Sequence, residues 1–134
     1  MALVVPDQGE VKLLEYIVNK SAPSDLVLHL YVDDVDLSVE DFTVSSFTES
    51  TAAGYASANL VGANWDVSTT EGITAAVYDT SIAFSFTEGD SVYGYYVTNS
   101  SSTLVLWAER FPGAPFNLPS GGGEISVRPQ LQLN

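Results

Sequence analysis

The 134-residue chain contains no cysteine, one histidine and only four lysine or arginine residues. The absence of cysteine excludes disulfide bridges, zinc–thiolate sites and thiol nucleophiles. The single histidine, His29, excludes a metal site built from several imidazoles, and we expect no metal and no cofactor. Because 17 acidic residues give a formal net charge of −13, we expect the chain to bind neither nucleic acid nor a membrane surface.

Long apolar runs are also missing. The opening run Ala2 to Val5 ends at Pro6 and Asp7, and it is too short for the apolar region of a secretory signal. No run approaches the roughly 20 apolar residues that span a bilayer. We therefore expect the protein to be made in the cytoplasm, and either to stay there or to leave by a route that needs no signal, such as a virus particle.

The composition is nevertheless that of a folded protein. Hydrophobic residues make up 46% and aromatic residues 11% of the sequence, which excludes a solvated, disordered tail. The length fits a single domain over residues 1–134.

The N-terminal segment predicts an arm followed by a helix. Residues 1–5 form an extended apolar arm, which either pairs with the domain's own sheet or docks on a neighbouring subunit. Residues 7–20 predict a helix, with Asp7 as its N-cap, Glu10 completing a capping box and Lys20 in its last turn. The apolar residues at largely helical spacing, with Leu13 widening the face, are Val11, Leu13, Leu14, Tyr16, Ile17 and Val18.

The rest of the chain predicts strands, because apolar and polar residues alternate in short runs bounded by turn signals. The nine runs are 25–32, 42–47, 55–61, 65–69, 73–78, 81–86, 92–98, 104–111 and 125–133. This pattern indicates a mainly β fold, an antiparallel, jelly-roll-like β-sandwich with one N-terminal α-helix. Pro129 requires the last run to be an edge strand or to begin beside the proline.

An acidic cluster runs from Asp33 to Asp41. Its carboxylates either decorate a solvated turn or form a weak cation site, although their spacing does not match the EF-hand pattern. Paired carboxylates could also hydrolyse glycosides, but they would have to face each other across a cleft, and the acids here lie mostly in turns.

The aromatic run 92–97 also has two possible structural interpretations. Its tyrosines either pack across strands inside the sheet or lie exposed and stack on sugar rings. Alternation places Tyr93 and Tyr95 on one face, and Gly94 indicates a bulge or a neighbouring side chain packed over it.

The sequence shows no catalytic machinery. His29 lies in the middle of a predicted strand and is expected to be a hydrogen-bonded structural residue. There is no nucleophile elbow and no phosphate-binding loop, so we expect no enzyme activity. Arg110 and Arg128 are expected to pair with carboxylates, within the domain or across an interface.

Three segments carry a resemblance to a known class of proteins. They are the opening MALVVPDQGE, which continues into Leu13 to Tyr16, the run VYGYYVT at 92–98, and LWAERF at 106–111. Together they resemble small virion structural proteins of tailed bacteriophages, particularly those of aquatic phages such as cyanophages. The resemblance implies a virion location and no active-site pattern.

Within that class we expect a capsid cement or decoration protein that binds the phage major capsid protein, or other virion proteins, and stabilises the assembled head as a homo-oligomer. The alternatives are a tail or fibre module that binds host surface glycans through exposed aromatic rings, and a small glycan hydrolase. The residues predicted to contribute to the interface are Leu3, Val4, Val5, Arg110 and Arg128.

Overall fold

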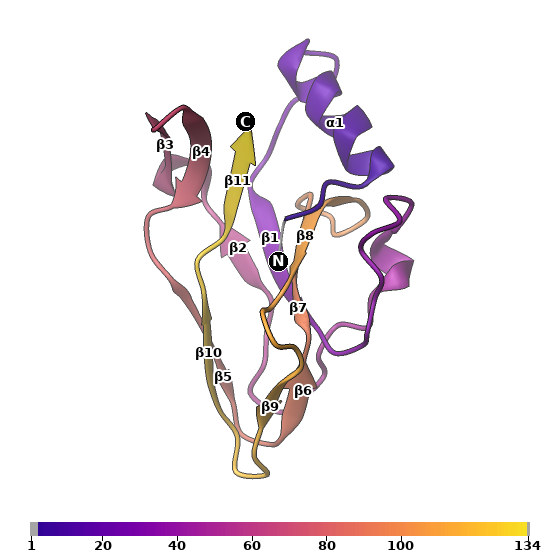
Figure 1. Cartoon of the computed structure of the whole chain (residues 1–134), viewed down its shortest axis with the longest axis vertical. Helices are drawn as coiled ribbons and strands as arrows, with labels where there is room; N and C mark the ends of the chain where they lie inside the picture. The colour runs from indigo at the N-terminus through magenta and orange to yellow at the C-terminus, as the bar shows by residue number, and fades with distance from the viewer. Residues whose placement is uncertain (1–2, 134) are drawn as a thin grey trace.

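Antiparallel strands make up most of the protein, and a helix lies beside them at the N-terminal end (Figure 1). The computed structural model describes residues 3–133. Its helical elements are α1 (Asp7–Ile17) and the short 3-10 helices η1 (Val44–Ser46) and η2 (Gly62–Asn64). The strands are β1 (Leu26–Tyr31), β2 (Ala58–Leu60), β3 (Trp65–Thr70), β4 (Ile73–Tyr78), β5 (Ile82–Phe86), β6 (Asp90–Val92), β7 (Gly94–Thr98), β8 (Val105–Arg110), β9 (Phe116–Leu118), β10 (Gly123–Val127) and β11 (Gln130–Leu133). The predicted mainly β, antiparallel fold with one N-terminal helix is therefore confirmed, whereas a jelly-roll connection of the strands stays a prediction.

The central sheet has the strand order β2-β1-β7-β8, and each neighbouring pair is antiparallel. β1 and β7 are buried almost throughout, because both faces of this sheet are covered. One face packs against the pair β5–β10 and the three-stranded sheet β11-β4-β3, which gives the fold its sandwich-like form. The core between them contains Leu28, Leu30, Leu60, Tyr78, Phe84, Phe86, Tyr95, Val97, Leu106, Trp107, Ile125 and Val127.

A bulge in β8 fixes the position of the helix. Val97 pairs with Trp107 and Thr98 pairs with Val105, so Leu106 is an extra residue on β8. The side-chain oxygen of Gln8 accepts the Val105 N–H at 2.8 Å. Helix residue Gly9 is buried against the Leu106 carbonyl, with no space there for a side chain. The helix therefore packs on the edge of the central sheet.

The segment between β1 and β2 covers the other face of the central sheet. Leu37, Phe42 and Phe47 are buried there, and the Phe47 ring stacks on Tyr96 with centroids 4.4 Å apart. The strand predicted at 42–47 is wrong, because residues 44–46 form η1 and the Thr43 N–H donates to the Ser46 hydroxyl at 3.0 Å. The two phenylalanines at its ends anchor a loop instead of alternating along a strand.

Helix α1 differs from its predicted ends. Pro6, rather than Asp7, occupies the N-cap position, and its carbonyl accepts the Glu10 N–H at 2.9 Å. The predicted capping box is therefore wrong; the Asp7 N–H instead donates to the Glu40 carbonyl at 2.8 Å. The helix ends at Ile17, before Lys20, because Asn19 adopts a left-handed conformation with φ 61°.

Two predicted runs each contain two strands, and one strand was missed. Residues 92–98 divide at Tyr93 into β6 and β7, and residues 125–133 divide before Pro129 into β10 and β11. β11 is an edge strand, as the proline indicated. The missed strand, β9, pairs with β6 and lies between prolines, which hid its short pattern.

Candidate functional site

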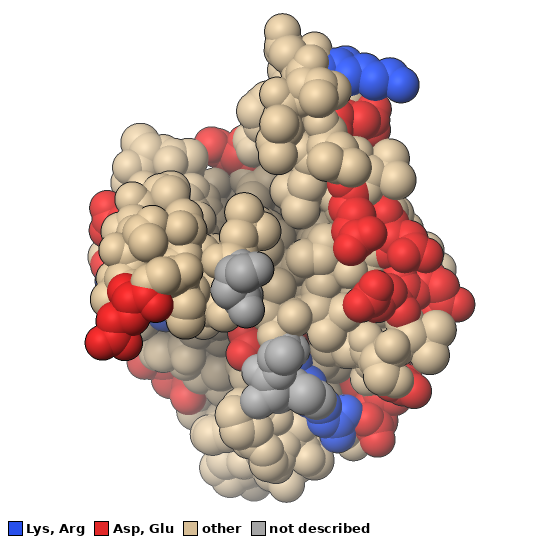
Figure 2. Space-filling model, turned by 45° about the horizontal axis from the view of Figure 1, so that its top comes forward, with Lys and Arg blue, Asp and Glu red and all other residues tan. Residues whose placement is uncertain are grey.

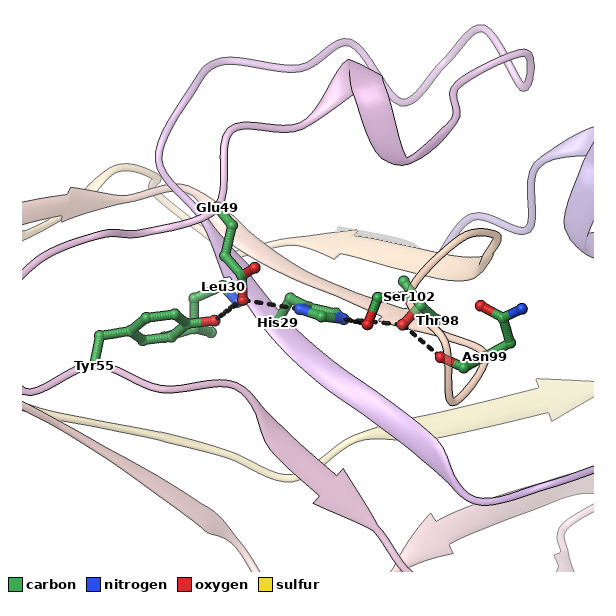
Figure 3. Close-up of polar contacts among 7 residues, drawn as sticks. All are labelled: His29, Leu30, Glu49, Tyr55, Thr98, Asn99 and Ser102. Carbon is green, nitrogen blue, oxygen red and sulfur yellow. Dashed lines mark hydrogen bonds and ion pairs between the residues drawn. The ribbon is translucent and has the colours of Figure 1, made fainter.

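His29 lies in a partly buried polar chain that joins three segments of the fold (Figure 3). Its Nδ1 lies 2.8 Å from Glu49 Oε2, and its Nε2 lies 2.9 Å from Thr98 Oγ1. The Tyr55 hydroxyl donates to the same Glu49 oxygen at 2.6 Å. The His29 ring also stacks on Tyr96, with centroids 4.7 Å apart. The His29 ring thus ties β1 to Glu49 of the segment between β1 and β2 and to Thr98 of β7.

The electrostatics of this chain follow from burial and from its hydrogen bonds. Burial raises the pKa of Glu49, but the hydrogen bonds from His29 and Tyr55 outweigh it, so the pKa lies below its ordinary value. Burial, and then the bond to Glu49, raise the pKa of the Tyr55 phenol. Because an ionised carboxylate only accepts, the His29 Nδ1 atom carries the proton in their contact.

Hydroxyl, imidazole and carboxylate stand here in the order that nucleophilic hydrolases use. The Thr98 side chain, however, is 0% exposed, and its hydroxyl donates to the Asn99 carbonyl at 3.0 Å. The Ser102 hydroxyl lies 3.5 Å from His29 Nε2, outside the usual range for catalytic proton transfer. A substrate cannot reach Thr98, so the geometry supports the structural role predicted for His29. Sequence reasoning missed both partners, because they lie 20 and 69 residues away.

The structure brings together two of the predicted interface residues, Val4 and Arg110. They line a hollow of about 540 Å³ beside the acidic loop. Val4 and Ala108 each donate a backbone hydrogen bond to the other at 2.9 Å, so the arm adds to the outer edge of β8. Arg110 pairs with Asp34 and lies over the Tyr93 ring at 5.1 Å, and the hydrogen bond to Asp34 raises the pKa of the guanidinium.

The other predicted interface residues lie apart from this hollow. Leu3 and Val5 are half-buried against the main core, while Met1 and Ala2 of the predicted arm lie outside the described residues. Arg128 donates to the backbone carbonyls of Tyr78 and Asp79, both at 2.7 Å. The part of the chain that the structure describes gives Arg128 no carboxylate partner. An interface role for all five residues stays a prediction.

The carboxylates of the acidic loop point to separate partners. Asp33 accepts the backbone and hydroxyl hydrogens of Thr48, each at 3.0 Å, and hydrogen bonds from Ser38 lower the pKa of Asp36. Among residues 3–133, no group of three or more acidic or histidine side chains is placed to hold a metal ion. The hydrogen bonds of Asp33 and Asp36 therefore stabilise the conformation of the loop.

The aromatic run is packed inside the protein. Tyr95 and Tyr96 are each 3% exposed, which agrees with cross-strand packing and leaves neither ring free for a sugar. Tyr93 packs on the loop-covered side with Tyr96, not with Tyr95, so the predicted shared face is wrong. The break between β6 and β7 shifts the alternation. Gly94 lies beneath the Tyr31 ring, as its position indicated.

An apolar groove runs between α1 and the sheet β11-β4-β3. It consists of two adjoining hollows of about 310 Å³ and 520 Å³, which have in common Leu13, Val67, Ala76 and Leu131. The far lip of the groove is exposed and apolar: Val67 is 70% and Leu133 is 73% exposed. We call this feature the apolar groove.

The outer face of α1 forms a ridge beside that groove. Val11, Leu14, Ile17 and Val18 are 60%, 62%, 78% and 69% exposed, and we call these four residues the α1 ridge. Figure 2 shows this end of the molecule as mostly uncharged surface, with acidic residues along both sides of it. The helical spacing identified these residues, but it did not indicate that the packed side of α1 is made by Gly9, Leu13 and Tyr16.

Comparison with known proteins gives no relative: no family model, no curated protein and no solved structure matches the chain. Within the described residues, no helix has the length and apolar character needed to cross a membrane.

Proposed function

We propose that the protein is a structural component of a tailed-phage virion that decorates and stabilises the assembled head. The observation that carries the proposal is the exposed apolar surface formed by the α1 ridge and the apolar groove. Soluble monomers rarely expose contiguous apolar patches of this kind, and such patches mark surfaces that are buried in an assembly. The resemblance of the arm and of two strand segments to small virion proteins points to the same role.

The remaining surface suits a protein on the outside of a particle. The net charge of −13 keeps decorated particles apart by mutual repulsion. The mechanism is mass action: a protein that binds the assembled lattice but not the free subunits shifts the equilibrium toward the lattice. The hollow beside the arm, where Val4 and Arg110 lie together, is a second surface that we propose for the capsid contact.

The tail or fibre alternative finds less support. A glycan-binding module needs aromatic rings on its surface, but Tyr95, Tyr96 and Trp107 are each at most 3% exposed, and among residues 3–133 only Phe116, at 51%, is a well-exposed aromatic side chain. The hydrolase alternative needs a reachable nucleophile or a pair of facing carboxylates, and the His29 chain offers a buried threonine.

The proposal is tested by adding purified protein to heads that lack it and heating them. We expect bound protein and a higher temperature of head disruption than in the same heads with albumin added. Heads that bind the protein without any gain in stability, or that leave it in the supernatant, would contradict the decorating role.

A further inference from the structure

We infer that the apolar groove is occupied by the α1 ridge of a second copy of this chain, in a two-fold symmetric dimer. The inference rests on the proposed function only in that it treats this surface as one buried in an assembly. It goes further by naming what covers it.

The first argument is shape. The α1 ridge borders the apolar groove, and two of its residues, Leu14 and Ile17, also form a wall of the larger hollow, so ridge and groove make one continuous patch. A two-fold axis brings one patch against the same patch of a second copy. The ridge of each copy then fills the groove of the other, so both features are buried by a single contact. A ring of three or more copies would need them on different sides of the molecule.

The second argument is charge. Two bodies of net charge −13 repel each other, so a self-contact is favoured where acids are fewest. Glu10 is the only acidic residue among those lining the larger hollow, and Asp25 the only one in the smaller. Residues 7–20 carry three acids, Asp7, Glu10 and Glu15, and two of the four cations in the sequence, Lys12 and Lys20, so the formal net charge of this segment is only −1. The acids of the 33–41 loop instead lie with the segment that covers the opposite face of the central sheet.

The third argument is the amount of apolar surface. Six exposed large side chains lie on α1, at the residue that follows it, and on the far lip: Val11, Leu14, Ile17, Val18, Val67 and Leu133. A stable contact buries about 800 Å² per partner, with an apolar centre. In a two-fold dimer the ridge of each copy meets the groove of the other, so these side chains form an apolar centre at two symmetry-related places in the contact.

Sedimentation of the purified chain over a range of concentrations tests the inference. We expect a species of twice the 14.3 kDa monomer mass, and we expect its association to tighten as sodium chloride rises to about 0.5 M, because salt screens the repulsion. A monomer at every concentration and salt would overturn the inference, and so would a complex that dissociates as salt rises.

Two matched variants locate the contact. Leu14→Glu adds a charge to the α1 ridge, where the side chain is already 62% exposed, so the fold is expected to survive. We expect it to weaken association at least about tenfold, because a carboxylate would have to enter an apolar groove. Val39→Glu adds the same charge on the acidic loop, at a residue that is 54% exposed, and should leave the dimer intact apart from general repulsion. Equal weakening in both variants would overturn the inference.

Cysteine cross-linking gives a second readout, since the natural chain has no cysteine. A mixture of Leu14→Cys and Val67→Cys chains should form a disulfide-linked pair, because the ridge of one copy lies in the groove of the other. A mixture of Leu14→Cys and Val39→Cys chains should not. Equal cross-linking in the two mixtures would contradict the two-fold arrangement.

Sedimentation and head binding of the same wild-type preparation separate this inference from the proposed function. If the wild-type chain is a dimer and never binds heads, the decorating role is wrong and the dimer stands. If the wild-type chain is a monomer and binds heads through this surface, the dimer is wrong and the decorating role stands.

Discussion

At the scale of single residues, Glu49 makes the stability of the fold depend on pH. Its pKa in the folded protein lies below the ordinary value of 4.5, so its contribution is present above that value and is lost as the pH falls through the folded pKa. We expect Glu49→Gln to lower the free energy of unfolding by about 1–2 kcal/mol at neutral pH. The loss should shrink at acid pH, where Glu49 is itself neutral.

Urea unfolding at several pH values checks this, with Glu124→Gln as the control. Glu124 is exposed on β10, and its neutralisation should have little effect at any pH. If Glu49→Gln lowers the free energy of unfolding by the same amount at pH values above and below 4.5, the charge of the Glu49 carboxylate does not stabilise the fold.

Gly94 is a residue whose lack of a side chain is needed for packing. An added Cβ would lie 2.7 Å from the Tyr31 hydroxyl oxygen and would also collide with the Glu109 carbonyl. Because core overpacking costs about 1–3 kcal/mol, we expect Gly94→Ala to lower the urea midpoint clearly. Gly121→Ala is the control, since an added Cβ meets nothing within 4 Å there. Equal midpoints for the two variants would be inconsistent with the close packing of Tyr31 on Gly94.

At the scale of elements, the long apolar-rich strands could be predicted, and the short or interrupted ones could not. β1, β4 and β8 lie within two residues of their predicted bounds, because each is an apolar-rich run of six residues with turn residues or polar residues beyond its ends. The 42–47 segment has strand-like residues but forms a 3-10 turn, since its phenylalanines pack on tertiary partners. The local sequence does not contain that information.

The candidate sites divide in the same way. Arg110 was predicted to pair with a carboxylate, and Asp34 supplies one, because the chain has far more acids than bases. The apolar groove could not be predicted, because it depends on where α1 docks relative to β11-β4-β3. That position is set by the Leu106 bulge and by Gly9, which meet only in the folded chain.

The N-terminal arm is the element whose removal should separate folding from assembly. Deleting residues 1–5 removes the two hydrogen bonds between Val4 and Ala108, and we expect a loss of about 1–3 kcal/mol in a chain that still folds. We also expect the truncated protein to decorate heads poorly. Val4→Ala keeps both backbone bonds and serves as the control for stability. If the deletion does not change the occupancy of the protein on heads, the arm is not part of the interface.

At the scale of the whole molecule, net charge limits the kinds of contact by which the protein could attach to a head in the proposed role. A chain with 17 acids and four bases cannot be drawn to a generic acidic surface, so apolar burial and a few ion pairs must supply the attraction. We expect occupancy on heads to change little, or to rise, as the ionic strength increases. Binding of labelled protein to purified heads from low to high salt checks this. Complete release at moderate salt would show that long-range attraction holds the protein.

The proposed decorating role is tested most directly by the place and copy number of the protein in purified phage particles, seen by cryo-electron microscopy. If the protein decorates the head, density that fits the fold of Figure 1 should repeat over the outer surface of the capsid, in hundreds of copies that follow the lattice of the major capsid protein. A few copies to some dozens on the tail or its fibres, with a bare head, would contradict the account.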